Sequence, residues 1–261
     1  MFEEISINSK HYYHNIISFI MLGIWIFIGV KGYKLRKYKS KHKISFLIII
    51  GCLLQESIDF MNRLFLDPMY NISIQRDLPL LQFCQLSFYF SLLCIYLTRD
   101  RVGDNQKYSI SQFFFDSAFL LGFSGAFQGI LTPEFVNINN LLGVICIQLQ
   151  HSLIILNLIW LMTAYNYKLK FKGVYLTYFL INVIAPFALL INRLIGTNSA
   201  GDSANYFYVN ELPKVDNFLL NFVNQYPSPD YILYIQPIFI IYFLLLYIPF
   251  FIINRLHNRY K

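Results

Sequence analysis

Charge is scarce in this chain of 261 residues. Only 13% of the residues are Asp, Glu, Lys or Arg, whereas 56% are hydrophobic. Soluble domains carry about twice that share of charged residues, so the composition excludes an ordinary soluble domain and predicts an integral membrane protein. The apolar segments follow one another with short joints, and we therefore expect a single membrane domain over residues 1–261.

Cysteine is also rare, and the pattern of the four cysteines argues against two kinds of site. All four fall within apolar runs, and no pair has CxxC spacing. We expect neither a disulfide framework nor a zinc site. The sequence shows no His/Asp cluster at ligand spacing and no Gly-rich phosphate loop, so no metal or other cofactor is implied. Residues 1–14 lack the features of a cleaved signal peptide, and the first apolar run is interpreted as a helix of the mature protein.

Long apolar runs dominate what is present. Seven of them approach the roughly 20 residues that a helix needs to cross a bilayer. They predict an all-α fold, a polytopic bundle of seven transmembrane helices, at about 12–33, 44–66, 79–98, 110–131, 141–164, 173–195 and 231–253.

The basic residues predict how the bundle is oriented. Most Lys and Arg residues fall in alternate joints, at 31–43, 99–107 and 168–172, and in the tail at 255–261. Cytoplasmic loops carry such an excess, which predicts an external N-terminus and a cytoplasmic C-terminus in a multi-pass protein of the cell membrane. The net charge of +7 is therefore interpreted as a topology signal and a contact with anionic lipid. We expect no nucleic-acid partner.

The longest external connection spans residues 196–230. Within it, apolar residues recur at i, i+3, i+4, i+7 and i+8 from Val215 to Val223. This spacing predicts an amphipathic helix at about 215–223 that lies in the outer interface. Such a segment serves either as a surface cap or as a lid over a substrate site, and the sequence leaves both open.

The stretch LPLLQFCQLS at 78–87 places a cysteine, Cys84, near the outer end of the third predicted helix. At about 1.5 Å per residue, Cys84 lies about 8 Å below the lipid surface and His151 of the fifth helix about 15 Å. A thiol needs a base to become a nucleophile, so the two form a candidate catalytic pair that should lie within a few ångströms. The alternatives are a cysteine that acts as a small apolar side chain and a histidine that bonds a neighbouring helix.

Further polar side chains are expected in the outer half of the bundle, where they would line a substrate cavity. Glu56, Asp59 and Arg63 share one helix face, which we interpret as a structural ion-pair cluster rather than a proton relay. Three amides are candidate donors to an oxyanion: Gln85, Gln148 and Asn192. Gln128 and Arg193 complete the set.

Several motifs, in their order along the chain, carry a resemblance to a known family. These are LPLLQFCQLS at 78–87, GAFQGILTPEF at 125–135, LQHSLII at 149–155, the Asn192, 196–198 and 205–206 positions, and LLLYIPF at 244–250. Together they resemble the YwaF-like integral membrane proteins of bacteria. Two departures stand out: Gln82-Phe83 replaces a histidine before the cysteine, and residues 199–204 look like an insertion.

The YwaF-like family is similar to an animal transmembrane phospholipid acyltransferase that uses a cysteine in the corresponding segment. It is more distantly similar to seven-span hydrolases of hydroxy-fatty-acid esters. The resemblance implies a lipid acyltransferase or lipid-ester hydrolase acting at the outer leaflet, with Cys84 as nucleophile, His151 as general base and membrane lipids as partners. The alternative is a non-catalytic binder or transporter of lipids or small molecules that uses the same cavity. A structural partner in a membrane complex is a third interpretation, and the oligomeric state is left open.

Overall fold

A computed structural model describes residues 5–98, 108–135, 137–213 and 218–259, and these described residues form helices and connecting segments without a strand. The predicted basic joint at 99–107 and the first residues of the predicted helix at 215–223 lie outside them. The elements are α1 (Ile7–Leu35), α2 (Lys41–Met61), the π-helical turn η1 (Asn62–Leu66), α3 (Phe83–Thr98), α4 (Ile110–Ser124), α5 (Ala126–Leu131), α6 (Leu141–Ala164), α7 (Phe171–Ile195), the 3-10 turn η2 (Tyr206–Tyr208), α8 (Phe218–Val223) and α9 (Tyr231–Arg259).

Six helices in the described part of the chain are long and apolar enough to cross a membrane. They are α1, α2 with η1, α4 with α5, α6, α7 and α9. The seventh expected helix, α3, is apolar but has only 16 residues. The fold is therefore all-helical and multi-pass, and a crossing by α3 stays a prediction.

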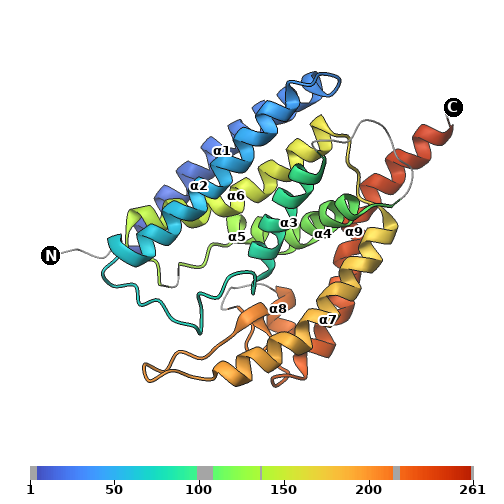
Figure 1. The fold of residues 1–261 in the computed structure, drawn as a ribbon. Coiled ribbons are helices and arrows are strands. Elements are labelled where there is room, and N and C mark those ends of the chain that lie inside the picture. Colours follow the sequence, from blue (N-terminus) through green and yellow to red (C-terminus); the bar gives the residue numbers. More distant parts are fainter. Residues whose placement is uncertain (1–4, 99–107, 136, 214–217, 260–261) are drawn as a thin grey trace.

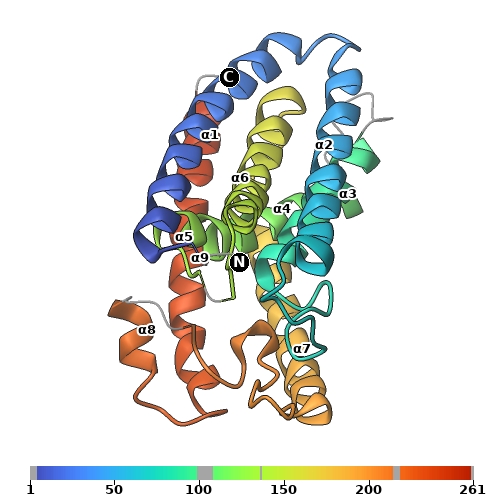
Figure 2. The same cartoon turned by 90° about the vertical axis from the view of Figure 1, so that its left-hand side faces the viewer.

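Helix α6 forms the centre of the bundle, with α1 along one side and α2, α3, α4 and α5 around it (Figures 1 and 2). In its most apolar window 61% of the residues are buried, against 11% in the corresponding windows of α1 and α9. Trp160 of α6 is fully buried, and its indole N–H donates to Ser45 of α2 at 2.9 Å. The outer helices instead expose apolar side chains, as expected of surfaces that face lipid.

The connections gather at two ends of the bundle. The turn between α1 and α2 and the C-terminal ends of α6 and α9 lie at one end (the upper part of Figures 1 and 2), whereas segments 67–82 and 196–213 lie at the other. The turn carries several of the basic residues of the 31–43 joint. The membrane side that each end faces stays a prediction.

Short polar side chains begin three of the helices. Ser6, Ser109 and Asn140 accept hydrogen bonds from backbone N–H groups of the first turns of α1, α4 and α6. Such caps satisfy amides that have no partner inside the helix. At the end of α7, Gly196 takes a positive φ of 63° that suits glycine.

Helix α3 begins at Phe83, four residues later than the run at 79–98 predicts. Pro79 disfavours helical geometry at the residue before it, and Leu80 takes a left-handed φ of 67°. The freed backbone is paired elsewhere: the Leu78 N–H donates to the Tyr206 hydroxyl at 3.0 Å, and the Phe207 N–H donates to the Leu81 carbonyl at 3.1 Å. Segment 196–213 thus covers the irregular chain that precedes α3.

Candidate functional site

Cys84 is the second residue of α3, so the thiol lies in the first turn of the helix, whereas the apolar run at 79–98 predicts a position further inside a longer helix. The residue is half-buried, and its Sγ lies 3.9 Å from Oε1 of Gln82. The N-terminus of a helix carries partial positive charge, which favours a thiolate, while burial in apolar surroundings opposes it.

The short helix α5 brings Cys84 and His151 to neighbouring places. An ideal Cβ added at Gly125 would lie 3.6 Å from the backbone nitrogen of Cys84, and one added at Gly129 would lie 2.6 Å from Cε1 of His151. The Gly129 N–H donates to the Gly125 carbonyl at 2.8 Å, so the two glycines are one helical turn apart and share a face. Cys84 and His151 therefore lie along the same face of α5, although no hydrogen bond joins their side chains among the described residues.

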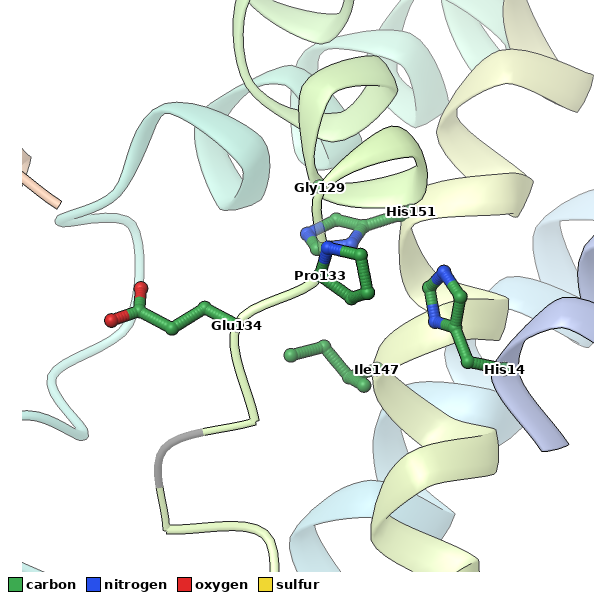
Figure 3. Close-up of a pocket in the computed structure, with 6 residues that line it drawn as sticks. All are labelled: His14, Gly129, Pro133, Glu134, Ile147 and His151. Carbon is green, nitrogen blue, oxygen red and sulfur yellow. The ribbon is translucent and has the colours of Figure 1, made fainter. Parts of the chain in front are cut away.

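A small pocket lies beside His151. Its walls come from α1, α5, α6 and the segment that follows α5, and its free space is that of about one water molecule. Figure 3 shows the rings of His14 and His151 entering from α1 and α6, with the Glu134 carboxylate directed away from both. The lining residues are His14, Gly129, Pro133, Glu134, Ile147 and His151.

Tyr208 of η2 links segment 196–213 to this site. Burial raises the pKa of its phenol, and the negative charges of Glu134 and Cys84 raise it further. The Tyr208 backbone takes a left-handed φ of 52°, and its carbonyl accepts a hydrogen bond from the Tyr231 hydroxyl. The phenol is therefore neutral at physiological pH.

The sequence pattern predicts no role for His14 or Tyr208. The predicted first helix began at residue 12, so His14 appeared to lie at a boundary, whereas α1 begins at Ile7 and buries it. The spacing of His11 and His14 at i, i+3 is a weak signal on its own. Tyr208 lies in an irregular segment, where periodicity carries no information about contacts.

The acidic and basic residues of α2 and η1 separate into two groups. Asp59 and Arg63 form an ion pair, as their i, i+4 spacing predicts, and Arg63 also reaches Asp77 at 3.3 Å. Glu56 instead accepts hydrogen bonds from Tyr89 of α3 at 3.3 Å and Gln150 of α6 at 2.9 Å. The first group anchors segment 67–82, and Glu56 ties three helices together.

The three amides proposed as oxyanion donors have different surroundings. Gln148 donates to the Ser18 hydroxyl of α1 at 2.6 Å, and Asn192 exchanges two hydrogen bonds, of 2.9 and 3.2 Å, with the backbone of Tyr206. Gln85 follows Cys84 directly in α3, and its Oε1 is buried without a partner in the described chain. Gln85 therefore adjoins Cys84 along the helix, whereas the amide side chain that contacts the sulfur is that of Gln82.

The remaining two predicted residues lie apart from each other. Gln128 is half-buried on α5, between the two glycines that face Cys84 and His151. Arg193 is exposed near the end of α7. No group of three or more His, Cys, Asp or Glu side chains at metal-binding distances occurs within the described ranges.

The fold is that of an all-helical, multi-pass membrane protein. Its central helix α6 carries His151, which lies beside the short helix α5. The TMEM164 family matches residues 7–247, and the chain belongs to this transmembrane family. No curated protein and no solved structure matches the chain.

Proposed function

We propose that this protein transfers or hydrolyses acyl groups of membrane lipids, with Cys84 as nucleophile and His151 as general base. The observation that carries the proposal is the shared face of α5, where Gly125 adjoins the Cys84 backbone and Gly129 adjoins the His151 ring. Catalytic hydrogen bonds are often long or poorly aligned before substrate binds, and a cysteine and a histidine that adjoin successive turns of one helix face suit covalent catalysis.

The chemistry of the first half-reaction follows from these two residues. The Cys84 thiol turns away from Gln82, gives its proton to His151 and attacks the carbonyl carbon of a lipid ester. A C–S bond forms, the ester C–O bond breaks, and His151 returns the proton to the departing alcohol. The acyl group is then held as a thioester until an acceptor hydroxyl or water removes it.

The neighbourhood of Cys84 supports stabilisation of the oxyanion. The first backbone N–H groups of α3 have no partners within the helix, and Gln85 follows Cys84 in the same first turn with an amide N–H₂ group that can donate. A donor placed where negative charge develops accelerates acyl transfer.

We further propose that α3 completes a seven-span bundle in the cell membrane, with the N-terminus and segments 67–82 and 196–213 outside. This orientation is supported by the basic residues in the turn between α1 and α2 at the other end of the bundle. It places the substrate in the outer leaflet. Proteinase K added to intact cells should cleave within 196–213 and spare the turn at 36–40.

The function is tested by intact-protein mass spectrometry after reconstitution into phosphatidylcholine vesicles. Wild type should carry a fatty-acyl adduct that hydroxylamine removes, and Cys84→Ser should lack it. His151→Ala should form the adduct at least about 100-fold more slowly. Cys146→Ser is the matched control, because this buried cysteine of α6 should leave both the adduct and lipid turnover unchanged.

Two outcomes would contradict the proposal. Lipid turnover that persists in Cys84→Ser would exclude the thioester route. Lipid that co-purifies with the protein and is not turned over, with equal binding by Cys84→Ser, would instead establish the non-catalytic lipid binder or transporter.

A further inference from the structure

His14 is a buried polar group within the apolar helix α1. Its side chain is 2% exposed, and its Nε2 lies 3.0 Å from the carbonyl oxygen of Ile130, the residue of α5 that follows Gly129. A carbonyl oxygen only accepts hydrogen bonds, so Nε2 carries a proton and Nδ1 of the neutral ring is an acceptor. This Nδ1 atom is buried and has no hydrogen-bond partner in the described part of the chain.

A buried acceptor without a partner is costly, and native proteins satisfy such atoms with a protein group, a water or a ligand. The pocket of Figure 3 lies directly beside the His14 ring and has space for about one water-sized group. Pro133 and Ile147 of its walls offer no side-chain or proline N–H donor to Nδ1. His151 also lines the pocket but makes no hydrogen bond to this Nδ1 among the described residues, so a small group that enters the pocket can supply the donor.

We propose that this pocket binds a hydroxyl group, which donates to Nδ1 of His14, and that His14 accepts the proton of this hydroxyl when it removes the acyl group from Cys84. The inference rests on the proposed acyl transfer and assigns its second half-reaction. The hydroxyl belongs either to water, which gives hydrolysis, or to a lipid alcohol, which gives transfer.

The bonds of this step balance without any further reactant. The hydroxyl oxygen attacks the thioester carbonyl, its proton passes to Nδ1 of His14, a C–O bond forms and the C–S bond breaks. Cys84 leaves as a thiolate and finally recovers the proton from the His14 imidazolium. During the step the Nε2–H group of His14 keeps its hydrogen bond to Ile130, which becomes stronger when the ring is charged.

The position of the pocket relative to Cys84 supports separate roles for the two histidines, with His151 as base for the thiol and His14 as base for the hydroxyl. Gly125, which precedes α5, lies against the backbone of Cys84, and Gly129, one turn further along, borders the pocket. Two histidines line the pocket from the adjacent helices α1 and α6, so one base can serve the thiol and the other the acceptor. His14 would then be a catalytic residue in α1, outside the motifs that identify Cys84 and His151.

The test separates formation of the thioester from its removal. His14→Gln keeps an amide N–H that can reach the Ile130 carbonyl but has no basic nitrogen. In single-turnover experiments with phosphatidylcholine vesicles, this variant should form the Cys84 adduct within about threefold of the wild-type rate and lose it about 100-fold more slowly. The matched control is His11→Gln, since His11 is exposed one turn earlier on α1 and also contacts Phe135 edge-on.

Ile147→Phe provides a second variant if His14→Gln unfolds in detergent. It fills the pocket from α6 without changing either histidine, and it should also accumulate the adduct. Reactions in H₂¹⁸O with and without lysophosphatidylethanolamine distinguish the two hydroxyl sources: ¹⁸O in free fatty acid identifies water, and acylated phosphatidylethanolamine identifies a lipid alcohol.

Each result decides between the two proposals. Removal of the adduct at the wild-type rate in both His14→Gln and Ile147→Phe would overturn the role of His14 and leave the acyl transfer at Cys84 intact. Absence of any Cys84-dependent adduct and turnover in wild type would overturn both.

Discussion

Gly129→Ala is the substitution that most directly tests the geometry of the site. An ideal Cβ at this position would lie 2.6 Å from Cε1, 2.9 Å from Nδ1 and 3.3 Å from Nε2 of His151. Carbon atoms in contact normally lie about 3.5–4.0 Å apart, so the His151 ring must move by about 1 Å. Overpacking of this kind costs about 1–3 kcal/mol.

The control is Gly51→Ala in α2, where no atom lies within 4 Å of the added Cβ. Alanine is the better helix former by about 1 kcal/mol at both positions, so the difference between the two variants isolates the overlap with His151. We expect Gly129→Ala to be less stable than Gly51→Ala by about 1–3 kcal/mol. Unfolding by SDS in mixed micelles, followed by the fluorescence of Trp25 and Trp160, measures both.

The same comparison in a His151→Ala background completes the test. Without the imidazole ring the overlap disappears, so Gly129→Ala should then behave like Gly51→Ala, and the coupling free energy between the two sites should be about 1–3 kcal/mol. A displacement of about 1 Å should also lower acyl turnover about 100-fold. Equal stabilities in both backgrounds would refute the placement of His151 against α5.

Three further predictions concern the surroundings of the site. Gly173→Ala should destabilise the protein by about 3 kcal/mol in the same assay, because the added Cβ overlaps the carboxylate of Asp116; unchanged stability would exclude this contact. Burial raises the pKa of Tyr70 from 10.0 to about 12. The protonated phenol therefore contributes fully to stability below pH 10, and this contribution is lost as the pH rises to 12. Tyr70→Phe should make the free energy of unfolding depend less steeply on pH in this alkaline range. Asn192→Ala removes two hydrogen bonds to the Tyr206 backbone. Chymotrypsin should then cut within 206–208 at least tenfold faster, because the free energy of local opening of this segment falls by about 1.4 kcal/mol.

Much of the fold follows from local sequence properties. A run of about 20 apolar residues must be helical in a bilayer, because each backbone polar group needs a partner there. The predicted start of the fifth run at 141 coincides with the start of α6, where Asn140 caps the first turn. The Asp59–Arg63 pair is also local, since i and i+4 share a helix face.

The start of α3 shows why local rules do not suffice. Residues 78–82 are apolar enough to extend the helix, yet their backbone groups bond to Tyr206 and Phe207, which lie more than 120 residues later. A contact between segments so distant in sequence has no period or spacing that would reveal it. The thiol consequently lies at a helix end, where the sequence alone placed it inside the helix.

The separation of Glu56 from Asp59 and Arg63 has the same origin. All three lie on one face of a regular helix, but Glu56 is held by partners from α3 and α6 and Arg63 by segment 67–82. Which carboxylate pairs with which cation or amide depends on the helices that pack against the face.

The sequence by itself determined a multi-pass helical membrane protein and the approximate extent of its helices. It also indicated Cys84 and His151 as a candidate nucleophile and base. These features are readable because hydropathy and residue type are local properties of the chain. Only the tertiary structure decided that α5 brings these two residues to one face, and that His14 is buried beside His151 with an acceptor that has no partner among the described residues. The physical reason is that burial, and the partner of each buried polar group, depend on which distant helices meet.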